Sequence, residues 1–145
     1  MTVTEQNFVI NGDSITILKA GDYFIGNTAK PTKKEFEKFV RSLPFQFPNL
    51  IIKQAYWESG HLKSDLVLNN NNLFGMKNPK RITFAVVCEQ EYAYYDDWRD
   101  SVLDRYLWDC LYVRGYNREC DYISVLDAIY SETENYIDTI KNVKL

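Results

Sequence analysis

The most constraining feature of this chain is an acidic residue on the side of a helix that should face the core. Ile51, Ala55 and Glu58 recur at the spacing of one helical stripe, Pro48 can open this helix, and Gly60 can cap its end. Burial and the negative end of the helix dipole both disfavour a carboxylate there. We therefore expect the pKa of Glu58 to be raised, which would suit a general acid. The alternative is a solvated glutamate at a frayed helix end.

A run of four asparagines, residues 69–72, follows this helix and precedes Leu73-Phe74-Gly75. Asparagine is a poor former of helices and strands, and its amide can bond neighbouring backbone or the amides and hydroxyls of a ligand. The run therefore predicts a polar loop that ends on an aromatic wall.

Hydrophobic periodicity predicts a mainly helical chain. Thr32 and Glu35 form a capping box for a first helix that ends before Pro44. The helix that carries Glu58 would follow from Pro48. Further helices are expected to begin at Ser64, at Asp96 or Asp97, at Asp121 and at Thr133.

Two segments have the alternating pattern of β-hairpins. Hydrophobic runs flank Asn11-Gly12, a preferred pair for a type I′ turn, and we interpret residues 1–26 as a short β extension. Residues 82–87 and 92–95 predict a second hairpin around a polar tip. The expected fold class is α+β, mainly α, with one compact domain over residues 27–145.

Composition and charge argue against several classes of binding partner and bound metal. The 145 residues carry a net charge of −3 and no basic stripe, so neither nucleic acid nor an anionic membrane is expected as a partner. No apolar run approaches the ~18 residues that a membrane span needs. His61 is the one histidine, which argues against a histidine-rich zinc site, and the three cysteines match no metal spacing. We expect no metal and reduced thiols.

Three blocks of the sequence have the order of motifs found in a known enzyme family. They are Glu58-Ser59-Gly60 with Asn71-Asn72-Leu73-Phe74-Gly75-Met76-Lys77, then residues 95–102 from Tyr95, then residues 128–137 with Asn135-Tyr136. Together they resemble the glucosaminidases of glycoside hydrolase family 73, which are peptidoglycan hydrolases of lysozyme-like fold. The resemblance implies that fold, with residues 82–95 as its small β lobe. It also implies no cofactor and cleavage of the β-1,4 bond after N-acetylglucosamine in glycan strands that alternate with N-acetylmuramic acid.

Glycosidic cleavage needs a proton for the leaving oxygen and a group that stabilises the oxocarbenium-like centre. Glu58 is the predicted proton donor. Glu89 and Glu91 lie at about the family's spacing for a second carboxylate, although solvated residues at a hairpin tip explain them equally well. Asp96 and Asp97 are alternatives, although helix capping explains one of them without any chemistry. The N-acetyl group of the substrate could also take this role. Tyr95 aligns with a tyrosine of the family's cleft, where its hydroxyl could bond the N-acetyl group, and the alternative is a core tyrosine.

The resemblance also suggests residues that bind the substrate. The candidates are Gln54, Asn71, Asn72, Phe74 and Gly75. Phe74 and Gly75 would form a floor beside Glu58, with the glycine allowing backbone to approach a sugar closely. The asparagine amides could instead stabilise the backbone of their own loop. Three basic residues could pair with carboxylates of the stem peptide or lactyl group, but a solvated charged face is the interpretation preferred for Lys77, Lys80 and Arg81.

Two other functions stay open. A muramidase or lytic transglycosylase of lysozyme-like fold shares the Glu-Ser-Gly motif, and a virion structural or wall-binding module could keep the cleft with low activity. The N-terminus lacks the pattern of a signal peptide, so we expect synthesis in a cytoplasm and action on the bacterial wall as a phage endolysin or virion-borne enzyme. A chain trimmed of its leader would look the same. The expected partners are peptidoglycan strands and, for a virion-borne enzyme, other virion proteins.

Overall fold

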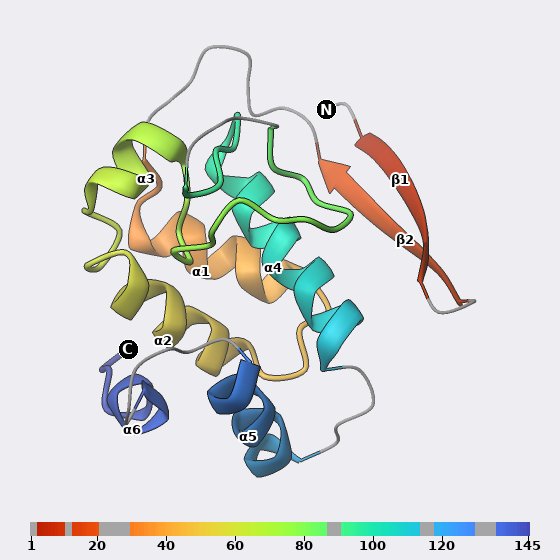
Figure 1. The fold of residues 1–145 in the computed structure, drawn as a ribbon. Coiled ribbons are helices and arrows are strands. Elements are labelled where there is room, and N and C mark those ends of the chain that lie inside the picture. The colour runs from red at the N-terminus through yellow and green to blue at the C-terminus, as the bar shows by residue number, and fades with distance from the viewer. Residues whose placement is uncertain (1–2, 11–12, 21–29, 87–90, 114–117, 130–135) are drawn as a thin grey trace.

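A computed structural model shows a mainly helical chain with one N-terminal hairpin (Figure 1). It describes residues 3–10, 13–20, 30–86, 91–113, 118–129 and 136–145, with side chains described from residue 30 onward except at 127–129. The elements are β1 (Val3–Ile10), β2 (Asp13–Ala20), α1 (Lys33–Ser42), α2 (Pro48–Glu58), α3 (Asp65–Asn70), α4 (Trp98–Tyr112), α5 (Glu119–Ile129) and α6 (Tyr136–Lys141). None of these described helices is long and apolar enough to cross a membrane.

The N-terminal hairpin has the register that its sequence predicts. Strands β1 and β2 pair antiparallel, with Ile10 opposite Asp13, so two residues connect them. Residues 11–12 lie outside the described part of the chain, as does the predicted boundary between residues 26 and 27. The strands of the predicted extension are therefore confirmed, and its status as a separate unit stays a prediction.

Local signals set the ends of the first two helices. Thr32 Oγ1 accepts from the Glu35 amide at 3.1 Å, and the Glu35 carboxylate accepts from the Thr32 amide at 3.3 Å, which confirms the capping box. Pro48 is the first residue of α2, where its missing N–H costs nothing. Ser59 is the C-cap of α2, and Gly60 follows it with φ +57. The left-handed backbone that ends this helix thus begins one residue beyond the cap, as is common for glycine.

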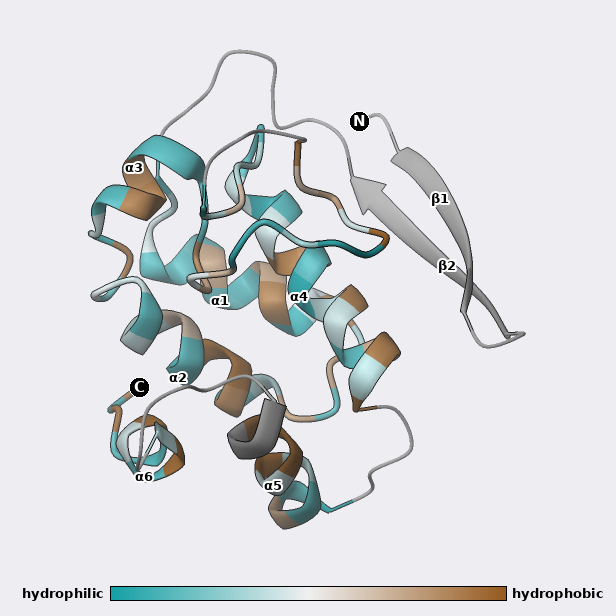
Figure 2. Cartoon of the chain, in the orientation of Figure 1, coloured by the Kyte–Doolittle hydropathy of each residue, from teal (hydrophilic) through white to brown (hydrophobic). Residues whose placement is uncertain are grey.

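Helix α2 is the central element, because it contacts both α1 and α6 (Figure 1). Phe36 of α1 packs against the rings of Tyr56, Phe74 and Trp98, with centroids 5.9, 6.4 and 6.4 Å apart. This aromatic cluster joins α1 to α2, to the loop after the asparagine run and to α4. Figure 2 shows hydrophobic and hydrophilic residues alternating along α1, α2 and α4, as expected for helices with one face in the core.

The later predictions for helices are mostly confirmed. Asp97 caps α4, with its side chain accepting from the Arg99 amide at 2.8 Å, so Asp97 rather than Asp96 is the cap. Helix α5 begins at Glu119, two residues before the predicted start. The predicted start of the last helix at Thr133 lies outside the described residues, and α6 is described from Tyr136.

The predicted second hairpin is not a regular ladder in residues 82–86 and 91–95, the parts of it that the structure describes. Pairing there consists of two isolated bridges, Lys77 with Tyr92 and Val86 with Tyr94. A buried carboxylate explains the difference. The Phe84 amide donates to Asp104 of α4 at 3.0 Å, so this amide cannot also serve a strand partner.

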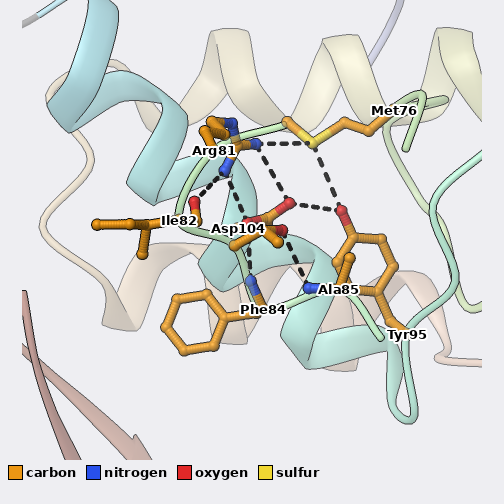
Figure 3. Close-up of polar contacts among 8 residues, drawn as sticks. Met76, Arg81, Ile82, Phe84, Ala85, Tyr95 and Asp104 are labelled. Atoms are coloured by element: carbon orange, nitrogen blue, oxygen red, sulfur yellow. Dashed lines mark hydrogen bonds and ion pairs between the residues drawn. The ribbon is translucent and has the colours of Figure 1, made fainter. Parts of the chain in front are cut away.

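Asp104 is the centre of a buried polar network that fastens this segment to α4 (Figure 3). Its side chain is fully buried and accepts from two nitrogens of Arg81 at 3.0 and 3.2 Å. It also accepts from the Thr83 hydroxyl at 2.8 Å, the Phe84 amide at 3.0 Å and the Tyr95 hydroxyl at 2.6 Å. The prediction that Arg81 belongs to a solvated face is therefore wrong, because its side chain is 13% exposed and paired.

Replacing Asp104 should destabilise the fold severely. Asp104→Ala leaves the Arg81 guanidinium buried without its partner, and loss of one member of a buried pair costs about 3–5 kcal/mol. Urea denaturation followed by circular dichroism would measure this loss. Asp138→Ala, at an exposed position of α6, is the matched control and should change stability by less than about 1 kcal/mol. Equal midpoints for Asp104→Ala and the wild type would contradict the role of this network.

Candidate active site

Glu58 is the last residue of α2 and continues its buried face. Ile51, Gln54 and Ala55 on this stripe are 1%, 1% and 0% exposed, and Glu58 is half-buried. The helix, its stripe and the position of Glu58 at its end therefore agree with the sequence pattern. The carboxyl group lies where the buried face of α2 meets the surface.

Each oxygen of the Glu58 carboxyl group has a different neighbour. The hydroxyl of Tyr136, the first residue of α6, donates to Oε1 at 2.7 Å. On the other side, a Cβ placed on Gly75 would lie 2.9 Å from Oε2. Gly75 has φ +62, so both its backbone conformation and this contact disfavour any side chain. The glycine after the asparagine run therefore lets backbone lie against the carboxyl group.

The electrostatic setting favours a protonated Glu58. Burial raises the pKa of this carboxyl above its ordinary value of 4.5, because removal from water disfavours the anion. The hydrogen bond from Tyr136 acts in the opposite direction and is the smaller effect. A carboxyl group of this kind can hold its proton at higher pH than a solvated glutamate and give it to a basic oxygen.

Gln54 joins this site from the preceding turn of α2. Its side-chain nitrogen donates to the Tyr136 hydroxyl oxygen at 3.0 Å, and its side-chain oxygen accepts from Nε of Arg105 at 2.8 Å. Sequence analysis placed Gln54 among substrate contacts. In the structure it is 1% exposed, and its amide lies between two protein side chains.

The guanidinium of Arg105 is held by further partners on α4 and α5. It is fully buried, pairs with Asp109 one turn along α4, and donates from Nη2 to the Tyr122 hydroxyl at 2.8 Å. Tyr122 in turn donates to Asp109 at 2.7 Å. The Trp108 ring lies 4.7 Å from the guanidinium carbon. These contacts neutralise the buried charge and fix the orientation of the guanidinium plane.

The asparagine amides build the loop that carries Gly75. Asn71 donates to the Tyr95 carbonyl at 2.8 Å and adopts φ +53, a conformation that asparagine tolerates. Asn72 donates to the carbonyls of Met76 and Ala93 at 2.9 and 3.1 Å, and its oxygen accepts from the Met76 amide at 3.2 Å. The amides thus tie the loop to the segment at residues 93–95, which is the structural alternative that the sequence left open.

The other predicted site residues lie in different surroundings. Phe74 and Tyr95 are fully buried, and the Tyr95 hydroxyl donates to Asp104. Glu91 is exposed, and its carboxylate lies 3.9 Å from the Lys77 ammonium. Glu89 lies outside the described residues. The structure therefore brings Gln54 and Gly75 together with Glu58, and it gives Phe74 and Tyr95 places in the core.

Two residues that organise the site were not singled out from the sequence. Tyr136 stands in the Asn-Tyr pair of the closing motif, to which no role was assigned. Arg105 shares a helical stripe with the buried residues Trp98 and Val102, so it is a charge on a core-facing side. That is the same signal that identified Glu58, and it could have found Arg105 too.

This chain is similar to known proteins in sequence and in fold. The sequence profile of the glucosaminidase family, described as mannosyl-glycoprotein endo-beta-N-acetylglucosaminidase, matches residues 45–144. Among solved structures, the catalytic domain of the autolysin Auto from Listeria monocytogenes is similar, with a TM-score of 0.47 and 21% identity over 81% of this chain and 86% of that one. A comparison with curated proteins gave no match. The matched residues 45–144 include Glu58 and the side chains that contact its carboxyl group.

Two glycines offer a matched test of the contact with Glu58. Gly60 and Gly75 have φ +57 and +62, but a Cβ on Gly60 would meet nothing within 4 Å. Gly60→Ala should therefore cost the backbone strain alone, roughly 1–2 kcal/mol, whereas Gly75→Ala should cost more because the new Cβ displaces the Glu58 carboxyl group. Thermal or urea unfolding would measure both, and Glu58→Ala should remove the additional cost of Gly75→Ala. Equal costs for the two glycine variants would contradict the contact.

Proposed function

Because the chain belongs to the glucosaminidase family and is a glycoside hydrolase, we propose that it cleaves the β-1,4 bond after N-acetylglucosamine in peptidoglycan, with Glu58 as general acid. The observation that carries this proposal is the Glu58 carboxyl group itself. It ends a buried helical face, its pKa is raised by burial, and it lies between the Tyr136 hydroxyl and the backbone of Gly75. The predicted endo-β-N-acetylglucosaminidase activity agrees with the family.

The proposed chemistry begins with proton transfer from Glu58 to the glycosidic oxygen. The bond from C1 of N-acetylglucosamine to this oxygen breaks, and its electron pair leaves with the oxygen of N-acetylmuramic acid. The resulting Glu58 carboxylate is then positioned to take a proton from the incoming water. Protonation before the reaction is essential to this role, and burial favours it by raising the pKa of Glu58.

Within this proposal, the loop after the asparagine run serves the substrate through its backbone. Asn71 and Asn72 fix the conformation of that loop, and the absence of a side chain at Gly75 avoids a clash with Oε2 of Glu58. Phe74 anchors the loop in the aromatic core. Tyr95 contributes by the same means, because its carbonyl accepts from Asn71 and its hydroxyl holds Asp104.

The second catalytic role is proposed for Glu89 or Glu91, with the substrate's N-acetyl group as the alternative. Glu91 is exposed, and its contact with Lys77 is long. Exposed ion pairs contribute little, about 0–1 kcal/mol, so this contact would not hold the Glu91 carboxylate away from a bound sugar. Separate Glu89→Gln and Glu91→Gln variants would identify the carboxylate. Full activity in both would exclude these two carboxylates and leave the N-acetyl group or Asp96, since the Asp97 side chain caps α4.

The setting of the enzyme is also part of the proposal. Its target would be the bacterial cell wall, with residues 27–145 as the catalytic unit and the hairpin of β1 and β2 as an extension. The match to residues 45–144 supports this division, since it leaves the hairpin out. A phage-encoded enzyme that works with other virion proteins is the more specific form of the proposal. Detection of this chain and of wall-degrading activity in purified phage particles would test it.

Replacing Glu58 should abolish most of the activity. General acid catalysis contributes roughly 100-fold to 10,000-fold, so Glu58→Gln should lower the rate of peptidoglycan digestion by at least ~100-fold. Mass analysis of fragments from purified peptidoglycan would measure the rate and identify the products. Glu119→Gln, which changes an exposed glutamate of α5, is the control and should keep wild-type activity.

The products of the same digestion separate the related enzymes. Reducing-end N-acetylglucosamine supports the proposal, whereas reducing-end N-acetylmuramic acid indicates a muramidase and a 1,6-anhydro ring indicates a lytic transglycosylase. Wall binding without turnover in the wild type would indicate a binding module. Comparable turnover by the wild type and Glu58→Gln would reject Glu58 as the acid.

The pH dependence should follow the protonated form of Glu58. A general acid is active while it holds its proton, so activity should fall as the pH rises through the pKa of this carboxyl group. Since burial raises that pKa, the alkaline limb of kcat/KM should have its midpoint above 4.5. A profile measured on soluble glycan strands would locate the midpoint. A limb at or below 4.5 would show that the group that titrates is not the buried Glu58.

A further inference from the structure

We propose that Arg105, Gln54 and Tyr136 form a positioning relay that fixes the proton of Glu58 on Oε2, the oxygen beside Gly75. The proposal rests on the proposed role of Glu58 as the acid and specifies which of its atoms reacts. The relay consists of three hydrogen bonds. Arg105 of α4 donates to Gln54 of α2 at 2.8 Å, and Gln54 donates to Tyr136 of α6 at 3.0 Å. Tyr136 then donates to Glu58 at the end of α2 at 2.7 Å.

The direction of these hydrogen bonds is determined at Arg105. A guanidinium can donate but cannot accept, and it keeps its charge at any pH that a protein tolerates. The Gln54 atom that faces Nε of Arg105 must therefore be the amide oxygen, which turns the amide nitrogen towards Tyr136. This nitrogen donates to the Tyr136 oxygen, so the tyrosine hydrogen is left to point at Glu58.

The carboxyl group of Glu58 is consequently asymmetric. Oε1 accepts the hydrogen bond from the Tyr136 hydroxyl. A proton bound to Oε1 would compete with the hydroxyl hydrogen of Tyr136 for the space between the two oxygens. The proton of the acid form therefore belongs on Oε2. In the bond-breaking step it moves from Oε2 to the glycosidic oxygen, while the electron pair of the C1–oxygen bond moves to that oxygen. The leaving oxygen must then approach the side of the carboxyl group that faces Gly75.

The structure holds the start of the relay rigidly. Arg105 is fully buried, is paired with Asp109 and bonds the Tyr122 hydroxyl. Rotation of its guanidinium would leave buried donors without partners, at a cost of about 1–3 kcal/mol or more for each group. Orientation at Arg105 is therefore transmitted to Gln54 and Tyr136, although Arg105 itself does not contact Glu58 in this chain of bonds.

Titration of Glu58 tests the relay without requiring catalysis. The carboxyl carbon of Glu58 can be followed by NMR in protein labelled with ¹³C-glutamate, with Glu58→Gln identifying the signal. Tyr136→Phe removes a hydrogen bond that favours the anion and should raise the pKa of Glu58 by about one pH unit. Tyr122→Phe removes a buried hydroxyl that lies off the path to Glu58, and Asp109 still pairs with Arg105 in this variant, so the relay is kept and this pKa should stay unchanged.

Gln54→Glu tests the direction of the relay. The carboxylate of this variant still accepts from Arg105 but cannot donate, so the hydrogen of Tyr136 turns away from Glu58 and towards the new carboxylate. The proton of Glu58 then moves to Oε1. We expect kcat on soluble glycan strands to fall by about 100-fold, the scale of losing the general acid. Gln54→Met removes the relay without reversing it and should cost about tenfold, the value of one hydrogen bond.

The outcomes distinguish a loss of the relay from a general loosening of the structure. They also distinguish failure of the relay proposal from failure of the proposed function. An added negative charge keeps Glu58 protonated to higher pH, so lost activity in Gln54→Glu cannot be explained by deprotonation. Activity of Gln54→Glu within about threefold of the wild type would overturn the relay, because a lost general acid costs far more. An equal shift of the Glu58 pKa in Tyr122→Phe and Tyr136→Phe would overturn it as well. Full activity of Glu58→Gln would refute the proposed function instead, while the NMR titrations would still decide on the relay.

Discussion

The structure depends on removing the Glu58 carboxyl group from water without leaving it unpartnered. Complete burial of an unpaired carboxyl group would be costly, whereas full exposure would give it an ordinary pKa. Half-burial at the end of α2, with the Tyr136 hydroxyl on one oxygen and the Gly75 backbone beside the other, lies between these limits. Desolvation dominates, and the tyrosine reduces its effect. The pKa of the carboxyl group is therefore raised, while one of its oxygens keeps a hydrogen-bond donor.

Helix α4 supports this site through two neighbouring buried charges. Asp104 gathers hydrogen bonds from the segment at residues 81–84 and from Tyr95, whereas Arg105 reaches α2 through Gln54. Each charge is neutralised by an opposite one, Arg81 for Asp104 and Asp109 for Arg105. Buried pairs contribute less to stability than their number of contacts suggests, because desolvation offsets their attraction. Their value here is geometric, since each admits few arrangements of its partners.

The asparagine run fixes the loop that lies beside Glu58. Its amides replace the regular strand pairing that a β lobe would otherwise need, by bonding the backbone of residues 76, 93 and 95. This arrangement leaves Gly75 against Glu58 and Phe74 in the core. The side chains of this polar loop are used internally, in hydrogen bonds to backbone. The part beside the Glu58 carboxyl group is then backbone, whose position is fixed by those side chains.

The sequence by itself determined the capping box of the first helix, the start of α2, the N-terminal hairpin register and the buried stripe that ends in Glu58. These follow from local rules, in which Thr32 with Glu35, Pro48, and a 3.6-residue period each act within a few residues. Tertiary structure alone decided that Arg81 pairs with Asp104 and that Gln54 faces Arg105 and Tyr136. It also decided that the Phe84 amide bonds Asp104 in place of a strand partner. The contacts between side chains join residues 23, 51 and 82 positions apart, so no local pattern specifies them. Burial of one charge creates the need for a partner, and the packing of helices determines which distant side chain supplies it.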